Sequence, residues 1–389
     1  MPGYELIDRK ERKEILHVMD KSKILCRQGF ENIRKKIFKV QEFENKFKNY
    51  FKSKYALGVT SGTSALRVAL ATLNLKPDDE IITQSFTFVA TVEAIVEARA
   101  IPICLNIDET LNLDPDELKK KINKKTKAVI VVHMLGVPAK ILEIRKICKE
   151  RSIILIEDTA WGCGATVNKK FLGTFGDIGT FSFDAAKTLT TGEGGMIIFR
   201  NKKNYKLAKA WHDHGHENNP KLNRWEDSRS SSGFNYRMNE LQAAVGIAQL
   251  KKLKKIVKIQ NNNLKVIWKS IKNIKGLKRR YEIPNSLPSA DALIIIVKNK
   301  EVALKCRKEL LKQGVSTKIL PEAYSWHFAQ TWDHIPELWD KKKNLKKNLN
   351  ISKKILERCV SIPIFIKQKK IFSKKIRMAF MKIEKELQK

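Results

Sequence analysis

The chain has 389 residues, 42% of them hydrophobic, so it can bury the cores of two or three domains and is not a small stapled scaffold. Its 77 Lys and Arg residues against 41 Asp and Glu residues give a formal net charge of +36, which makes nucleic acid and anionic membranes partners to consider. The lysines are spread along the whole chain without an isolated basic tail, a pattern typical of a solvated surface, so we expect no nucleic-acid binding.

The cysteines and the apolar runs predict the compartment. The six cysteines form no CxxC pair and no cluster with histidine at metal-ligand spacing, which favours a reduced, cytoplasmic setting without a metal site. Acidic and basic residues are mixed at the start of the chain, where a secretory signal needs an apolar run. No apolar run approaches the ~18 residues that span a bilayer, so we expect no membrane insertion.

Short apolar runs alternate with longer amphipathic stretches from Tyr55 to about Arg200, a pattern typical of a parallel sheet with crossover helices. The β-branched runs Ala128–His133 and Ile153–Asp158 predict buried parallel strands, and Gly195–Phe199 predicts another. Apolar residues at helical spacing predict a helix over Met238–Leu253.

The composition changes near Lys251, after which lysine-rich helical segments surround one apolar strand candidate, Ala292–Val297. We therefore predict a large α/β domain over residues 1–250, with a mostly parallel central sheet flanked by helices, and a smaller α+β domain over residues 251–389. No Pro/Gly linker marks the boundary between them.

Two of four segments that carry chemistry lie in the first half of the chain. In the segment Thr60–Leu70, TSGTSALRVAL, hydroxyl and glycine residues precede the start of a predicted helix. The free N–H groups of a helix N-terminus can bind a phosphate. An ordinary N-cap is the alternative. In IILIEDTAWG, an apolar strand ends in Glu157 and Asp158, and ligands of open parallel sheets bind outside such strand ends. An acid there can hold a pyridine nitrogen protonated, or it can merely cap the next helix.

The third segment, Gly179–Phe199, is the most specific. Lys187 has only Asp184 as a charged neighbour before the turn at Gly192–Gly195, and a desolvated lysine loses its proton readily enough to form a Schiff base. Ser182 can donate to a phosphate, although a polar residue on a strand is the alternative.

The fourth segment, Gly233–Gly246, places Asn235 and Arg237 just before a helix that begins near Asn239. Asn235 can donate to a phosphate, and Arg237 can grip a carboxylate with two hydrogen bonds. Both can also serve only to cap and solubilise the helix.

Together, SGTSAL, IEDTA, FSFDAAKTLTTGEGG and NYRM resemble the motifs of the DegT/DnrJ/EryC1/StrS sugar aminotransferases, within the fold-type I enzymes that use pyridoxal 5'-phosphate (PLP), and the resemblance runs almost end to end. It implies that Lys187 carries PLP and that Asp158 is the partner of its pyridine nitrogen. Dehydratases of the same fold carry His where this chain has Lys187, so the residue argues against that activity.

The resemblance also implies a way of holding PLP. It assigns the phosphate to Thr63, Ser64 and Ser182, and stacking on the ring to Phe88 in QSFTFVAT. Asn235 matches a residue that reaches the phosphate from the neighbouring subunit. A homodimer with shared active sites is therefore expected.

The sequence departs from the family pattern at two places. Trp161 stands where Gln or His is usual near the phenolic oxygen of PLP, and His212 stands where an Arg is expected. The opening MPGYELIDRKERKEI, the HDHGH run and SWHFAQTWDHIPELW (Ser325–Trp339) are similar to a subgroup that aminates 8-dehydro-3-deoxy-octulosonate, a keto sugar acid of lipopolysaccharide.

The expected reaction moves the amino group of glutamate to a keto sugar in two half-transaminations, with Lys187 as general base and acid. Candidate ligands of the sugar carboxylate are Arg237, His214, His216 and His327, each with a surface, packing or capping role as the alternative. An aminotransferase acting on a nucleotide-linked keto sugar would share every cofactor residue. A non-catalytic basic binding protein is the alternative of another class.

Overall fold

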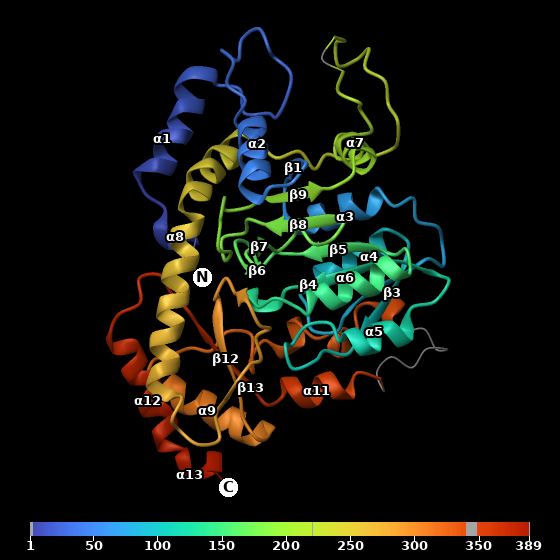
Figure 1. Cartoon of the computed structure of the whole chain (residues 1–389). Coiled ribbons are helices and arrows are strands. Elements are labelled where there is room, and N and C mark those ends of the chain that lie inside the picture. The colour runs from blue at the N-terminus through green and yellow to red at the C-terminus, as the bar shows by residue number, and fades with distance from the viewer. Residues whose placement is uncertain (1–2, 220, 340–347, 389) are drawn as a thin grey trace.

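A seven-stranded sheet forms the centre of the computed structural model, which describes residues 3–219, 221–339 and 348–388 (Figure 1). The strand order is β1-β9-β8-β5-β4-β2-β3. The strands are β1 (Tyr55–Val59), β2 (Glu80–Gln84), β3 (Ile101–Leu105), β4 (Thr126–Val132), β5 (Ile154–Asp158), β8 (Ile178–Ser182) and β9 (Gly195–Phe199). The predicted strands at 128–133, 153–158 and 195–199 are thus confirmed.

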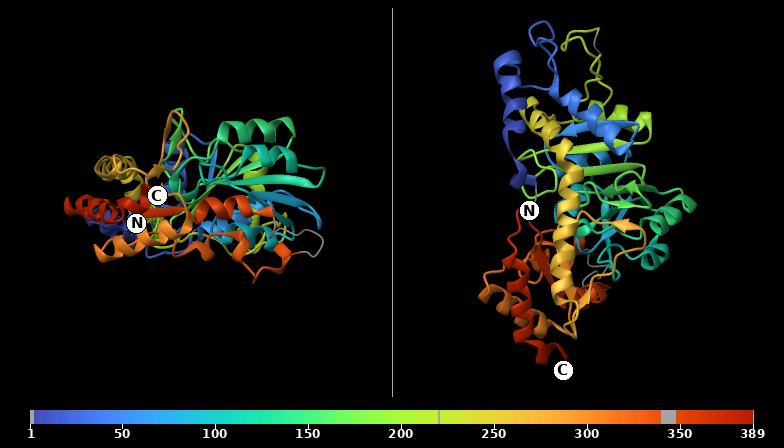
Figure 2. Two further views of the ribbon diagram at one scale, coloured as in Figure 1. Left: turned by 90° about the horizontal axis from the view of Figure 1, so that it is seen from below. Right: turned by 60° about the vertical axis from the view of Figure 1, so that its left-hand side comes forward.

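Successive side chains of each strand point to opposite faces of this sheet, so alternate residues contact the helices of different faces. Ala128 and Ile130 of β4 pack with the helices of one face, α3 (Gly62–Ala71), α4 (Ala90–Glu97) and α7 (Lys202–Trp211). Val129 and Val131 point to the opposite face, where α5 (Pro115–Lys121) and α6 (Ile141–Glu150) lie. Further along that face, α2 (Lys39–Phe51) and the first half of α8 (Glu240–Ile271) cover β1, β8 and β9. Helices flank the sheet on both faces (Figure 2), which confirms the predicted α/β architecture.

One strand runs against the parallel pattern that the sequence predicted for it. β9 pairs antiparallel with both β8 and β1, whereas β8, β5, β4, β2 and β3 are parallel neighbours. The reason is the connection: residues 183–194 return directly from β8 to β9 without a crossover helix, and a direct return makes the pair antiparallel. This loop contains Lys187.

The C-terminal part builds a second core around the three-stranded sheet β10-β12-β13. The second half of α8 packs there with α9 and α12, and Figure 1 shows α8 running from the large sheet to this part. The elements are β10 (Lys278–Arg279), β12 (Ala292–Ile296), β13 (Cys359–Pro363), α9 (Lys300–Lys312), α11 (Asn350–Leu356), α12 (Ile371–Lys382) and α13 (Glu384–Gln388). The predicted strand at 292–297 is confirmed, and the predicted boundary after residue 250 lies inside α8.

The remaining elements are short. A small sheet joins β11 (Ser286–Leu287), β6 (Thr166–Val167) and β7 (Lys170–Phe171). The other helical segments are η1 (Gly3–Leu6), α1 (Arg9–His17), η2 (Val18–Ser22), η3 (Met134–Gly136), η4 (Tyr324–Trp326), η5 (Ala329–Thr331) and η6 (Pro336–Trp339). In the part of the chain that the structure describes, no helix is both long and apolar enough to cross a membrane. All six cysteines are free, and five are buried.

The N-terminal segment lies at the junction of the two parts (Figure 1). The Gly3 amide donates to the Lys187 carbonyl at 3.0 Å, and the Glu5 carboxylate accepts from the amides of Ile366 and Lys367. The chain start therefore touches both the loop that carries Lys187 and the C-terminal part.

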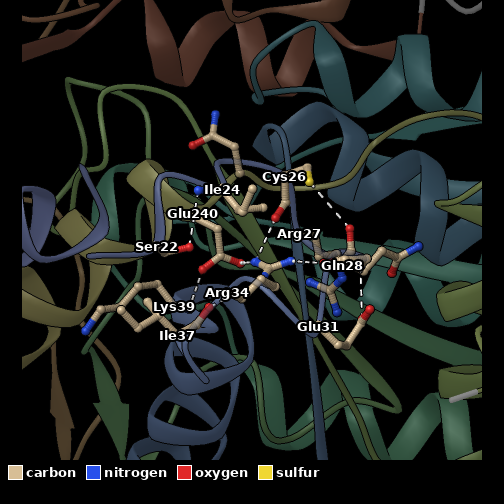
Figure 3. Close-up of polar contacts among 12 residues, drawn as sticks. Ser22, Ile24, Cys26, Arg27, Gln28, Glu31, Arg34, Ile37, Lys39 and Glu240 are labelled. Carbon is tan, nitrogen blue, oxygen red and sulfur yellow. Dashed lines mark hydrogen bonds and ion pairs between the residues drawn. The ribbon is translucent and has the colours of Figure 1, made fainter. Parts of the chain in front are cut away.

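Buried ion pairs fix the chain between α1 and α2, and Figure 3 shows the pair of Arg34 and Glu240. The fully buried Arg34 guanidinium lies 2.9 Å from the Glu240 carboxylate and donates to the carbonyls of Cys26, Gly29 and Ile37. Arg27 makes a two-pronged bond to Glu44 at 2.6 and 3.0 Å. We call Arg27, Arg34, Glu44 and Glu240 the N-terminal ion-pair cluster.

Candidate active site

Lys187 lies in the loop between β8 and β9, and hydrogen bonds within this loop fix the backbone of Lys187. Its amide donates to the Asp184 carbonyl at 3.0 Å, and the Asp184 carboxylate caps the turn by accepting from the Ala186 amide at 2.8 Å. The Lys187 Nζ atom lies 3.4 Å from the ring centre of Trp161. Burial of the amine lowers the pKa of Lys187 to about 8, and the nearby Lys318 acts in the same direction. The amine is therefore neutral far more often at pH 7 than that of a surface lysine.

Asp158 ends β5 at the carboxyl edge of the sheet and is buried. Its carboxylate accepts from the Ala160 amide at 3.1 Å and from the Thr91 hydroxyl at 3.2 Å. Burial raises the pKa of Asp158, although these bonds and the positive charge of Lys187 oppose the rise. An acid with so few partners has free acceptor capacity, which a ligand with an N–H group can use.

The preceding carboxylate, Glu157, points to the other face of the sheet, as the strand period requires. It accepts from the amides of Gly173, Phe175 and Gly176 at 2.6–2.9 Å, and it contacts the His133 ring at 3.1 Å. All of these partners are buried protein groups. Glu157 therefore holds the fold, and only Asp158 is available to a ligand.

Four further side chains complete the surroundings of Lys187. Lys318 Nζ lies 4.7 Å from the centre of the Trp161 ring and forms an ion pair with the buried Asp291. His327 is buried, its ring centre 5.6 Å from that of Phe88. Burial lowers the pKa of His327 to about 4, and Lys187 and Lys318 add to the effect, so the ring is neutral at pH 7.

The structure brings together four of the residues that the sequence singled out, and their roles stay predictions. The structure brings Lys187, Asp158, His327 and Phe88 to one region, and Phe88 is 42% exposed, which leaves its ring free to pack on a ligand. Sequence reasoning missed Lys318 and Asp291, because nothing distinguishes Lys318 from 76 other basic residues in the sequence. The only local signal was its position between two apolar segments.

The N-terminus of α3 lies against the end of β8. A Cβ atom added to Gly62 would come within 2.7 Å of the Ser182 Cβ, so only glycine permits this approach. Ser61 caps the helix: its Oγ accepts from the Ser64 amide at 3.0 Å, and the Ser64 Oγ accepts from the Ser61 amide at 2.8 Å. Thr63 is exposed, whereas the Ser64 hydroxyl is held by the cap. The structure thus places Thr63 and Ser182 at a helix N-terminus, and their binding of a phosphate stays a prediction.

The other predicted residues form a separate group. Arg237 forms an ion pair with Asp213, which also holds Arg224 at 2.6 Å. Asn235 is exposed, and its side chain accepts from the Arg237 amide at 3.3 Å.

The histidines of the HDHGH run lie in the same group. His214 is exposed, and His216 is buried with Nδ1 3.3 Å from the Asp227 carboxylate. Burial lowers the pKa of His212 to about 3, and its Nδ1 lies 2.6 Å from the Lys209 carbonyl. Within the described residues of one chain, the bonds of these histidines and of Asn235 and Arg237 do not run to Lys187 or Asp158. Their roles in substrate binding stay predictions.

Known proteins share both the sequence pattern and the fold. Residues 21–374 match the model of the DegT/DnrJ/EryC1/StrS aminotransferase family. A GDP-perosamine synthase of Vibrio cholerae is 37% identical over 276 residues, which cover 67% of this chain and 68% of that protein.

Two solved structures are similar over nearly the whole chain. The Helicobacter pylori PseC, an aminotransferase involved in the biosynthesis of pseudoaminic acid, superposes with a TM-score of 0.85 at 24% identity and covers 98% of this chain and 97% of that one. An E. coli GDP-4-keto-6-deoxy-D-mannose-3-dehydratase with bound hydrated PLP has a TM-score of 0.82 at 26% identity, covering 96% and 97%. These likenesses confirm the predicted fold-type I architecture.

Proposed function

Since the chain belongs to the DegT/DnrJ/EryC1/StrS aminotransferase family, and is therefore a PLP-dependent sugar aminotransferase, we propose that it takes an amino group from glutamate and passes it to a keto sugar with Lys187 as the catalytic base. The proposal rests on the partly buried Lys187 amine, which lies 3.4 Å from the centre of the Trp161 ring and close enough to the buried carboxylate of Asp158 for their charges to interact. Burial lowers the pKa of this amine to about 8. A base whose pKa lies close to the working pH both accepts and returns a proton efficiently.

The described residues fit PLP by their chemistry. Lys187 would hold the cofactor, and Asp158 has the free acceptor capacity that a protonated pyridine nitrogen needs. The N–H groups at the start of α3, with Thr63 and Ser182, would hold the phosphate, and Phe88 would pack on the ring. When bound, PLP supplies an electron-withdrawing ring that stabilises negative charge on the carbon next to the amino nitrogen.

The chain's own residues then have three tasks. The neutral Lys187 amine would take up the proton from the Cα atom of glutamate and later give a proton back, and it would act in the opposite direction when the keto sugar enters. The Asp158 carboxylate would keep its partner nitrogen protonated. Trp161, which is partly buried, and His327, which is 8% exposed, would shield the amine from water.

For the acceptor, we propose a nucleotide-linked keto sugar. The support is the 37% identity to a GDP-perosamine synthase, together with a dTDP-4-dehydro-2,3,6-trideoxy-D-glucose 4-aminotransferase of Saccharopolyspora spinosa among the relatives. The second candidate is 8-dehydro-3-deoxy-octulosonate, giving 8-amino-3,8-dideoxy-manno-octulosonate for lipopolysaccharide. The HDHGH run and Ser325–Trp339 favour it, and the second of these places His327 close to Lys187.

We further propose that the enzyme is a homodimer with shared active sites. Asn235 is exposed next to Phe234, a 55% exposed aromatic side chain, and both follow the 82% exposed Trp225 in one surface segment. Such apolar exposure favours contact with a second chain. Mixing inactive Lys187→Ala and Asn235→Ala chains should restore part of the activity, because one of the two sites is then intact. No recovery in confirmed mixed dimers would count against the arrangement.

One experiment tests the reaction and separates the acceptors. The purified protein with PLP should show the visible absorbance of the lysine-bound cofactor, which glutamate should replace by that of the aminated cofactor. Adding a nucleotide-linked keto sugar or the octulosonate should restore the first spectrum only for the true acceptor. The Lys187→Ala variant is the control. A wild-type spectrum that glutamate leaves unchanged would refute the proposed donor reaction.

A further inference from the structure

A second cation shares the Trp161 ring with Lys187. The Nζ atoms of Lys187 and Lys318 lie 3.4 and 4.7 Å from the centre of this ring, so the two nitrogens are within about 8 Å of each other. They come from distant parts of the chain, the β8–β9 loop and the segment after α9. The fold therefore brings a second ammonium group close to the catalytic amine.

Lys318 is held in place from several sides. Its amine forms an ion pair with Asp291, which is 1% exposed, and its amide donates to the Ser361 carbonyl at 2.8 Å. The Trp161 carbonyl accepts from the Ser289 hydroxyl at 2.8 Å. Ser289 and Asp291 belong to the same short segment before β12, so one piece of chain holds both the backbone of Trp161 and the second cation.

The charged groups around Lys187 include Asp158, Asp184 and Asp291, three acids that favour a proton on its amine. The indole face also attracts a cation, so the ring alone would favour the proton as well. His327 is neutral at pH 7 and adds no charge. Lys318 is thus the nearby cation that opposes protonation of Lys187.

We propose that Lys318 is a positioning residue of the transamination, a fixed cation that Asp291 holds over Trp161 so that the amine of Lys187 stays available as a base. This inference rests on the proposed function, in which Lys187 must be neutral to act. Two unit charges at most about 8 Å apart in a partly buried site shift the pKa of either group by about one unit or more. Loss of the Lys318 charge should therefore lower the neutral fraction of Lys187 at pH 7 about tenfold.

The test measures Lys187 itself in the full-length, cofactor-free chain. A trace amount of acetic anhydride acetylates neutral amines only, and peptide mass spectrometry gives the extent at Lys187 from pH 6 to 11. The wild-type midpoint should lie near 8, and in Lys318→Met it should rise by about one pH unit. Lys318→Arg keeps the cation and should restore the wild-type midpoint. Lys300→Met removes an equal charge from an exposed pair with Glu357 and should leave the midpoint in place.

An unchanged midpoint in folded Lys318→Met, or an equal rise in Lys318→Arg, would overturn the proposal. If the single variant does not fold because Asp291 is left unpaired, the neutral pair Lys318→Met/Asp291→Asn takes its place. It should show a smaller rise, since an attraction is removed with the repulsion, and no rise would again overturn the proposal. A normal response of the wild-type spectrum to glutamate with no shift in these variants would reject the role of Lys318 alone, and the proposed function would stand.

Discussion

The N-terminal ion-pair cluster and the surroundings of Lys187 both bury charge, but they treat it in opposite ways. In the cluster, Arg34 faces Glu240 and Arg27 faces Glu44, so each described charge has an opposite partner within 3.0 Å. Lys187 and Asp158 lie near each other, yet the described residues give neither of them an ion pair. Burial without direct compensation destabilises the charged form, and it also leaves each group free to react. In these two places, the charges that hold the fold are paired, and the two groups proposed for the chemistry have no ion-pair partner among the described residues.

Among the variants that test this contrast, we expect the largest effect from Lys187→Met. We expect aminotransferase activity to vanish, because the catalytic base is gone, while the cofactor-free chain becomes more stable at pH 7. The pKa of Lys187 is about 8 in the folded chain, below its value in the unfolded chain. Protonation of this buried amine therefore lowers the free energy of unfolding below pH 8, and this destabilisation fades as the pH rises toward the unfolded pKa. The gain should reach at most about 3 kcal/mol at pH 7 and disappear near pH 10. Urea unfolding of both proteins across this range measures it, and a less stable variant at pH 7 would contradict the contrast.

The adjacent residues Asp158 and Glu157 allow the same comparison between a carboxylate available to a ligand and one that holds the fold. Asp158→Asn should reduce the turnover at least about 100-fold, because an amide cannot keep a pyridine nitrogen protonated, and should change stability by less than about 1 kcal/mol. Glu157→Gln should do the reverse and should cost about 3 kcal/mol, because its new NH2 group would face at least one backbone N–H donor that now bonds to a carboxylate oxygen. Steady-state kinetics and urea unfolding of both variants give the two numbers. Equal losses of activity and stability in Asp158→Asn would make that residue structural.

Arg34→Met removes one side of a compensated pair. It should destabilise the chain by about 3–5 kcal/mol, because Glu240 and three carbonyls lose their partner in a fully buried place. Turnover per folded molecule should be unchanged. Adding Glu240→Gln should recover part of the loss, which a double-mutant cycle measures. As a control, Lys46→Met breaks an exposed pair with Glu42 and should cost less than about 0.5 kcal/mol.

The sequence predicted the sheet and the position of Lys187 because both depend on local pattern. The strands at 128–133 and 153–158 are continuous apolar runs, and the glycines after Lys187 mark the return to β9. The direction of β9 was not predictable from its composition, since an apolar run has the same appearance in parallel and antiparallel sheets. The neighbours Lys318 and Asp291 are separated from Lys187 by more than a hundred residues, so only the fold could reveal them.

Asp213 extends the comparison to the ion-pair partner of Arg237, the residue that the sequence assigned to the substrate site. Burial alone would raise its pKa, but Arg224, Arg237 and Gln28 outweigh burial and lower the pKa of Asp213 to about 2. A folded pKa below the unfolded value means that the carboxylate contributes stability above about pH 4 and loses it as pH falls toward 2. Wild type should therefore lose up to about 1 kcal/mol more than Asp213→Asn between pH 5 and pH 3, measured by urea unfolding. Parallel losses would show that the two arginines do not stabilise Asp213, and Arg237 would then be free to bind a substrate carboxylate.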